Sequence, residues 1–179
     1  MTPLPSGLPD LVADDEVLAR HVFTSNKSDL RSDKDGNLSA KYNAFMPQPT
    51  EHGWLRSVTR TLALDGQVGI ERNGQEVGQM GDPQRVLHAT ILVTAAAVRS
   101  VVVRDKDRKP VGSMDVLADE PPDHHAHLVN YPERIDGENP KELQKEVAQD
   151  LADAVNEVLA RQLPLEAWER EAEERRRSR

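Results

Sequence analysis

The chain has 179 residues, enough for one domain with its own core and too few for two full domains. Its 31 acidic and 23 basic residues give a formal charge of −8, which disfavours nucleic acid as the main ligand. The absence of cysteine excludes disulfides and thiolate metal ligands, and no apolar run is long enough to cross a membrane.

Both ends of the chain differ in composition from its middle. Residues 1–11 hold three prolines and one glycine in a polar setting, which predicts a flexible N-terminal arm. The N-terminus has neither the basic nor the apolar region of a secretory leader, so we expect a cytoplasmic protein. We expect a single domain over residues 12–163, followed by a charged helix or tail over 164–179.

The first part of the domain predicts short strands. Residues 14–24 begin with acids and end in β-branched and aromatic residues, which indicates a helical turn followed by a strand. Residues 44–47 and 54–60 indicate two more short strands, separated by a loop that contains proline and glycine.

The polar stretch 25–40 has the composition of an exposed loop. Within it, residues 33–37 (DKDGN) resemble part of a calcium-binding loop. The register excludes such a loop, because Arg31 and Tyr42 would occupy its first and last ligand positions. We therefore expect a plain Asp-Gly turn.

Residues 68–78 surround Asn73-Gly74, a pair that favours the positive φ angles of a two-residue hairpin turn. This predicts a β-hairpin, although the flanks are rich in glycine. A helix that begins near Leu62 is the alternative.

The strongest strand candidate is residues 86–93, which we expect at the centre of the sheet. Thr94 then stands where a helix N-cap would, before a short helix over 95–100. A further strand is expected at 101–103, and residues 111–117 form either another strand or a loop.

The clearest element is a helix over residues 140–162. Asn139-Pro140-Lys141-Glu142 combines an N-cap residue, proline at the first helical position and an early glutamate. An apolar stripe follows, which must pack on the sheet or on a partner, either another protein or a second copy. Its members are Leu143, Val147, Leu151, Ala154, Val155, Val158 and Leu159. Together the elements predict an α+β fold, in which this helix packs a small, largely antiparallel sheet.

Residues 123–132, DHHAHLVNYP, hold three of the six histidines. If the segment is extended, Asp123, His125 and His127 share one face and His124 points to the other. These three side chains form a candidate site for zinc or another divalent metal. The segment departs from the patterns of metallo-β-lactamase-like hydrolases and cupins, and the alternatives are a plain polar strand or a pH-sensitive contact.

His88 precedes Ala89-Thr90, and His-x-Thr on a strand resembles half of the two-histidine phosphoesterase motif. The resemblance implies that the histidine acts as a general acid or base on a phosphate ester. His125 and His127 are the nearest candidates for the second half, but no Ser or Thr follows them at the required position. The alternative is a histidine that is satisfied within the core.

A set of basic side chains is a candidate anion pocket, because arginine forks match carboxylate and phosphate groups. The alternative is that these arginines are solvated or paired with the many acids of the chain. The set consists of Arg20, His21, Arg56, Arg60 and Arg99.

Read in order, LARHVF, AFMP, SVTR, VTAAAVRS and HAHLVNYP resemble a pattern of small bacterial proteins without a settled activity. The resemblance covers roughly residues 17–132 and implies a compact α+β domain. With no complete catalytic set visible, we expect a non-enzymatic binding or accessory protein that acts through a protein partner at residues 140–162, with no cofactor. The alternative is a hydrolase or phosphoesterase that uses His88 with Asp123, His125 and His127, with or without a metal.

Overall fold

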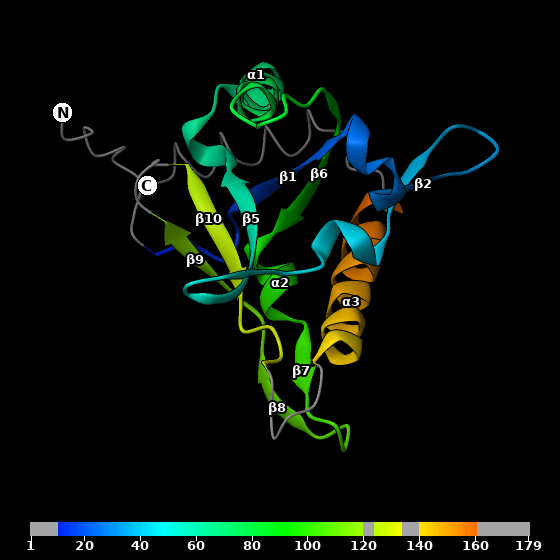
Figure 1. Cartoon of the computed structure of the whole chain (residues 1–179), viewed down its shortest axis with the longest axis vertical. Helices are drawn as coiled ribbons and strands as arrows, with labels where there is room; N and C mark the ends of the chain where they lie inside the picture. Colours follow the sequence, from blue (N-terminus) through cyan, green and yellow to red (C-terminus); the bar gives the residue numbers. More distant parts are fainter. Residues whose placement is uncertain (1–10, 120–123, 134–139, 161–179) are drawn as a thin grey trace.

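A computed structural model describes residues 11–119, 124–133 and 140–160, which fold around one antiparallel sheet (Figure 1). The sheet has six strands in the order β6-β1-β5-β10-β9, with β4 paired to β5. Its strands are β1 (Val17–Phe23), β4 (Gln48–Thr50), β5 (Gly53–Arg60), β6 (Leu87–Thr94), β9 (Asp115–Asp119) and β10 (His125–Val129).

Two small hairpins and three helices complete the described fold, with short 3₁₀ turns at residues 24–29, 42–45 and 61–63. One hairpin pairs β2 (Leu30–Ser32) with β3 (Leu38–Ala40), and the other pairs β7 (Val102–Arg104) with β8 (Pro110–Ser113). The helices are α1 (Gly66–Gln79), α2 (Ala95–Arg99) and α3 (Lys141–Ala160). None of the helices described has the length and apolar character needed to cross a bilayer.

The predicted α+β class is confirmed, and α3 packs its apolar stripe into the domain. Helix α3 lies on the opposite side of the sheet from α1 (Figure 1). Of the predicted stripe, Val147, Leu151 and Val155 are no more than 3% exposed, and so are their neighbours Ala148 and Ala152. These five residues therefore serve the core and are not available to a partner; the predicted N-cap Asn139 lies outside the described residues.

The sheet has two faces that differ in chemistry. Residues of β1 and β5 that point towards α3, such as Leu18 and Val58, join the hydrophobic core. Because side chains alternate along a strand, His21 and Thr59 point to the other face, where α1 packs against β1 and β6. His125 pairs with Thr59 across β10 and β5, which places it on this second face as well.

The prediction of a β-hairpin at residues 68–78 is wrong, because these residues form α1, the alternative considered. Asn73 is 4% exposed in the middle of the helix, and its side chain bonds to groups of the sheet. A Cβ added at Gly74 would lie 2.8 Å from His21 Nδ1, and one at Gly78 would lie 2.3 Å from the Arg85 carbonyl oxygen. The glycines therefore allow close packing of the helix, and they do not mark a turn.

We expect Gly78→Ala to destabilise the fold by about 1–3 kcal/mol, because the new methyl group overlaps the Arg85 backbone. Gly112→Ala is the matched control, since a Cβ at Gly112 meets nothing within 4 Å. Urea unfolding monitored by circular dichroism measures both. Equal midpoints for the two variants would contradict the close packing of α1.

The expected central strand instead forms one end of the sheet, as β6. Its apolar residues still pack, with Ile91 and Val93 only 4% and 1% exposed, because a strand at the edge can bury the side chains of one face. The predicted N-cap is confirmed, since Thr94 Oγ1 accepts a 3.2 Å hydrogen bond from the Ala97 amide at the start of α2.

The Asp-Gly turn is also confirmed and closes the β2–β3 hairpin. Asp33 Oδ1 accepts hydrogen bonds of 2.9 Å from the amides of Asp35 and Asn37. Gly36 has a φ of 84°, the left-handed conformation that glycine adopts without strain. The carboxylate therefore stabilises the turn itself.

Candidate metal centre

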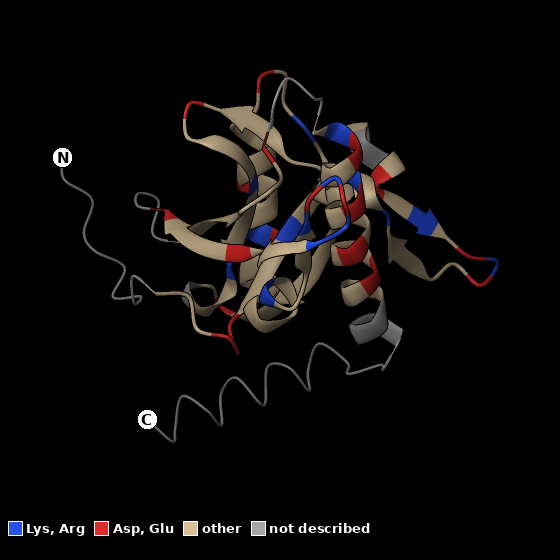
Figure 2. Cartoon of the chain, turned by 90° about the horizontal axis from the view of Figure 1, so that it is seen from below, with Lys and Arg blue, Asp and Glu red and all other residues tan. Residues whose placement is uncertain are grey.

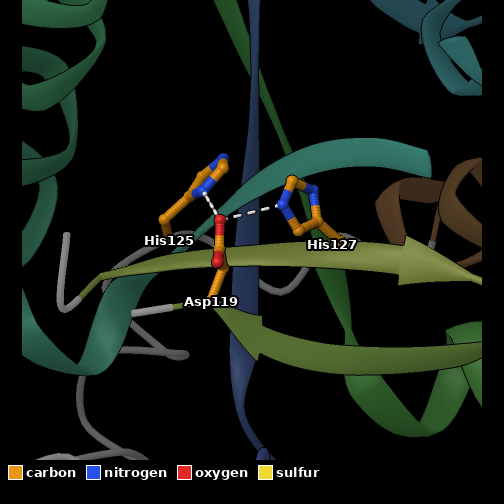
Figure 3. A group of neighbouring side chains, drawn as sticks. All are labelled: Asp119, His125 and His127. Carbon is orange, nitrogen blue, oxygen red and sulfur yellow. Dashed lines mark hydrogen bonds and ion pairs between the residues drawn. The ribbon is translucent and has the colours of Figure 1, made fainter. Parts of the chain in front are cut away.

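Two histidines and one aspartate meet at the paired strands β9 and β10 (Figure 3). Asp119 Oδ2 lies 2.9 Å from His125 Nδ1 and 2.9 Å from His127 Nε2. The ligand atoms of the three residues all lie within 4.8 Å of one another. The side chains are partly open to solvent, with exposures of 42%, 27% and 21% for Asp119, His125 and His127.

The register of β9 and β10 explains how the three side chains meet. Asp119 is the direct cross-strand partner of His125, and His127 follows two positions along the same face. The two imidazole rings are edge-to-face, with centroids 4.6 Å apart. The strand pairing therefore holds the three side chains in place.

The sequence prediction named the two histidines correctly as neighbours but chose a different carboxylate. Asp123 lies outside the described residues, and Asp119 was not considered. Asp119 is separated from the histidines by six and eight positions, and only the pairing of β9 with β10 brings it close. A search for an acid on the preceding strand of a hairpin would have found it.

The protonation states of two of the groups suit metal binding. Burial lowers the pKa of His125, and this effect outweighs the hydrogen bond with Asp119. Burial would raise the pKa of Asp119, but hydrogen bonds from His125 and His127 reverse that shift and lower it. At neutral pH these two groups are a neutral imidazole and a carboxylate, the forms that bind a cation.

Two of the three spacings between the ligand atoms are close to those of a coordination sphere. With ligands about 2.1 Å from a metal, neighbouring ligands lie about 3.0 Å apart in an octahedron and about 3.4 Å apart in a tetrahedron. The two distances from Asp119 Oδ2 are 2.9 Å, and the three ligand atoms all lie within 4.8 Å of one another. His127 Nδ1 is buried without a hydrogen-bond partner in the described part of the chain, so Nε2 is the nitrogen that the ring presents.

His124 does not belong to this group, although not for the predicted reason: it precedes β10 and turns towards α1, on the same side of the sheet as His125. His124 Nε2 accepts a 3.0 Å hydrogen bond from Asn73 Nδ2 on α1. Asn73 Oδ1 in turn accepts hydrogen bonds from His21 Nε2 at 3.0 Å and from Thr59 Oγ1 at 3.2 Å. These residues form a polar network beneath α1, which the sequence did not predict.

His88 lies far from the histidines of β10. It is exposed on β6, and strands β1 and β5 lie between β6 and β10. Three strand spacings of about 4.8 Å separate the two strands by roughly 14 Å. The structure therefore does not bring His88 together with His125 and His127, as the phosphoesterase prediction requires.

Arg20 and Arg56 bind protein groups on the core face of the sheet. The Nε atoms of both donate to the Ala44 carbonyl, at 3.1 Å and 2.9 Å. Burial, together with the charge of Arg56, lowers the pKa of Arg20 to about 9, and the nearby Asp29 carboxylate opposes this. Burial lowers the pKa of Arg56 as well. Because the pKa of arginine is so high to begin with, both guanidiniums remain charged at neutral pH.

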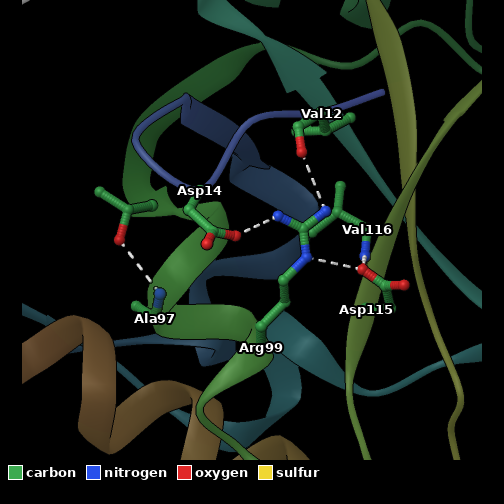
Figure 4. A network of polar contacts seen from close by, with 7 residues as sticks. Val12, Asp14, Ala97, Arg99, Asp115 and Val116 are labelled. Carbon is green, nitrogen blue, oxygen red and sulfur yellow. Dashed lines mark hydrogen bonds and ion pairs between the residues drawn. The ribbon is translucent and has the colours of Figure 1, made fainter. Parts of the chain in front are cut away.

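The remaining arginines of the predicted anion pocket also pair within the chain. Arg60 donates to both carboxylate oxygens of Glu16, at 2.7 Å and 2.9 Å. Arg99 pairs with Asp14 and Asp115 and donates to the Val12 carbonyl (Figure 4).

The five predicted residues therefore do not form one anion pocket. Arg20 and Arg56 point to the core face, whereas His21 lies on the opposite face of β1. Figure 2 shows the basic residues of the described chain spread among acidic ones, without a single basic face.

Comparison of the chain with protein-family models, curated proteins and solved structures found no match. A proposal for the function of this chain therefore rests on the geometry of the site.

Proposed function

We propose that this chain is a metal-binding protein that holds a divalent transition metal, zinc by preference, through Asp119, His125 and His127. The observation that carries the proposal is the convergence of both histidines on one carboxylate oxygen, each at 2.9 Å. Two imidazole nitrogens and one carboxylate oxygen form a ligand set that suits zinc.

Three protein ligands leave at least one coordination position of zinc open. The partial exposure of all three side chains supports access of a further ligand from outside. The proposal is a binding function, in line with the sequence expectation of a non-enzymatic protein. A phosphoesterase that combines this cluster with His88 has less support, because two strands separate the groups.

The proposal is tested by isothermal titration calorimetry, in which zinc is added to the untagged, chelator-treated protein. We expect one zinc ion per chain in the wild type. Loss of a residue that only supports a metal ligand weakens metal binding by roughly 10–100-fold. His127→Ala removes a ligand itself, so it should weaken zinc binding by more than this. His125→Ala should act in the same way.

Two matched variants sharpen this experiment. His88→Ala removes an exposed histidine from another strand and should bind zinc like the wild type. Asp119→Ala should weaken binding more than Asp123→Ala, because Asp119 contacts both histidines. Wild-type affinity in His127→Ala, or loss of binding in His88→Ala, would refute the proposed site.

A further inference from the structure

Three side chains beneath α1 are joined in one line of hydrogen bonds. Thr90 Oγ1 lies 3.1 Å from His21 Nδ1, and His21 Nε2 lies 3.0 Å from Asn73 Oδ1. Thr90 and His21 are direct cross-strand partners, so the pairing of β6 with β1 holds the hydroxyl beside the ring. The β-branched side chain of Thr90 has few rotamers, which helps to fix the hydroxyl there. A hydroxyl beside an imidazole, whose other nitrogen is held by a third group, is the arrangement of an activated nucleophile.

The hydrogen bonds of Asn73 decide which nitrogen of His21 carries the proton. Asn73 Nδ2 donates to His124 Nε2, so the amide turns its oxygen towards His21. Because this oxygen can only accept, His21 Nε2 donates to it and Nδ1 keeps its lone pair. Burial lowers the pKa of His21 and outweighs the opposing hydrogen bond with Asn73. At pH 7 the ring is therefore neutral, and Nδ1 can accept the proton of the Thr90 hydroxyl.

The imidazole is covered by protein, whereas Thr90 lines an open groove. His21 is only 4% exposed, and a Cβ added at Gly74 of α1 would lie 2.8 Å from its Nδ1. Thr90 is partly exposed and lines a groove of about 840 Å³ beside α1, a volume within the range of ligand-binding clefts. A substrate in this groove can therefore reach Thr90 while the helix covers His21.

The groove also has a backbone donor at Thr90. The Ala95 amide donates a 3.0 Å hydrogen bond to the Glu16 carbonyl, and bonded pairs alternate with non-bonded pairs along an antiparallel ladder. Thr90 therefore falls in a non-bonded pair with His21, and its N–H points away from β1. No strand pairs with this side of β6 among the residues that the structure describes. The N–H is available to stabilise a negative charge that forms on the carbonyl oxygen of a substrate.

Apolar side chains flank Thr90 on its strand. Leu87 reaches the same point of α1 as His21, since a Cβ added at Gly74 would lie 2.9 Å from Leu87 Cδ2. Leu92 follows Thr90 by two positions on the same face of β6, and both leucines line the groove. This lining suits a short alkyl chain.

We propose that Thr90 and His21 form a catalytic site that hydrolyses esters of short alkyl carboxylic acids. Thr90 Oγ1 attacks the carbonyl carbon of the ester and passes its proton to His21 Nδ1. The bond from this carbon to the alcohol oxygen then breaks, and the alcohol leaves with the proton from His21. A water molecule gives a proton to His21 as it attacks the acylated threonine. The carboxylic acid leaves, and the proton returns from His21 to Thr90 Oγ1.

This activity goes beyond the proposed zinc site and does not depend on it. The nucleophile and the base lie on β6 and β1, whereas the candidate metal ligands lie on β9 and β10. Asn73 is a positioning residue, because it holds the ring of His21 and does not line the groove.

The first test locates the reaction of an alkyl fluorophosphonate with the wild-type chain at pH 7. This reagent forms a stable bond to an activated hydroxyl oxygen and loses fluoride. We expect labelling of Thr90, located by mass spectrometry of peptides, and no labelling of the chain unfolded in urea. Absence of labelling, or labelling only at other residues, would overturn the proposal. This result does not depend on the stability of any variant.

Rates of p-nitrophenyl butyrate hydrolysis separate the hydroxyl from the shape of its side chain. Thr90→Val keeps the shape and removes the hydroxyl, and His21→Gln removes the base; each should lower the rate roughly 100-fold or more. Thr90→Ser keeps the hydroxyl and should stay within about tenfold of the wild type. Circular dichroism checks that each variant is folded. A wild-type rate in Thr90→Val, or an equal loss in Thr90→Ser and Thr90→Val, would refute the role of the hydroxyl and overturn the proposal.

Two controls exclude other sources of hydrolysis. His52→Ala removes an imidazole that is 78% exposed and should leave the rate unchanged. EDTA should also leave the rate unchanged, because no step of the proposed reaction uses a metal. A rate that either control abolishes would overturn the proposal, since a surface histidine or the metal site would then be the catalyst. Zinc titration tests the metal site by itself, so the two proposals can fail separately.

Discussion

Replacing Glu16 with alanine is expected to destabilise the fold by about 3–5 kcal/mol, because it leaves the Arg60 guanidinium buried without its carboxylate. The two side chains are only 1% and 3% exposed, and both carboxylate oxygens accept from the guanidinium. Arg60 ends β5 and Glu16 directly precedes β1, so the pair ties together two neighbouring strands of the sheet. Urea unfolding at pH 7 measures the loss.

Two controls show whether burial causes this effect. Asp14→Ala removes the partner of a more exposed arginine, Arg99, and should cost less than about 1 kcal/mol, because solvent screens that pair. The double variant Glu16→Leu with Arg60→Met should recover much of the loss, since an apolar pair needs no charge partner. If Glu16→Ala costs no more than Asp14→Ala, the buried pair contributes little to stability.

Features whose signal is local could be predicted from the sequence. Helix α3 follows from an apolar stripe within the helix and from Pro140, which directly precedes it. The Thr94 cap and the Asp33 turn are equally local, because each side chain bonds to amides within four positions of its own. Local structure can be predicted from residue preferences where the hydrogen-bond partners of a residue are its sequence neighbours.

Helix α1 was only the alternative to a hairpin, because its unusual residues are explained by distant partners. Asn73 and Gly74 resemble a turn when they are read alone. In the fold, Asn73 bonds to His21, 52 positions away, and Gly74 leaves room for the same ring. Tertiary packing overrides the local preference of Asn73-Gly74 for a turn.

The partners of the charged residues also could not be predicted from the sequence. Glu16 pairs with Arg60 across 44 positions, and Arg99 with Asp14 across 85. The candidate metal site was half predicted for the same reason. The spacing of His125 and His127 is set within one strand, whereas the choice of Asp119 depends on the register between two strands.

The polar network beneath α1 supports the last prediction, which concerns Asn73. We expect Asn73→Leu to destabilise the fold by about 3–5 kcal/mol at pH 7, because it removes a hydrogen-bond partner of two buried groups and one partly buried group. These groups are His21 Nε2, Thr59 Oγ1 and His124 Nε2. Urea unfolding measures the change, and Gln75→Leu, at an exposed position of the same helix, is the control.

The pH dependence of stability distinguishes this network from simple packing. Burial lowers the pKa of His21, and although the hydrogen bond with Asn73 raises it, the charges of Arg20 and His124 add to the lowering. The unfolded chain therefore takes up the proton first. The contribution of His21 to stability is complete above about pH 6.5 and is lost as the pH falls, by up to about 1.4 kcal/mol per pH unit.

Asn73→Asp should reverse the sign of this dependence. The new carboxylate would favour the protonated form of His21, which raises the pKa of this histidine in the folded state. Its stabilising effect is then present below about pH 6.5 and is lost as the pH rises. Relative to the wild type, the variant should be strongly destabilised at pH 8 and should recover towards pH 5. Parallel stability profiles for the two proteins would mean that His21 does not sense the residue at position 73, which would contradict the network.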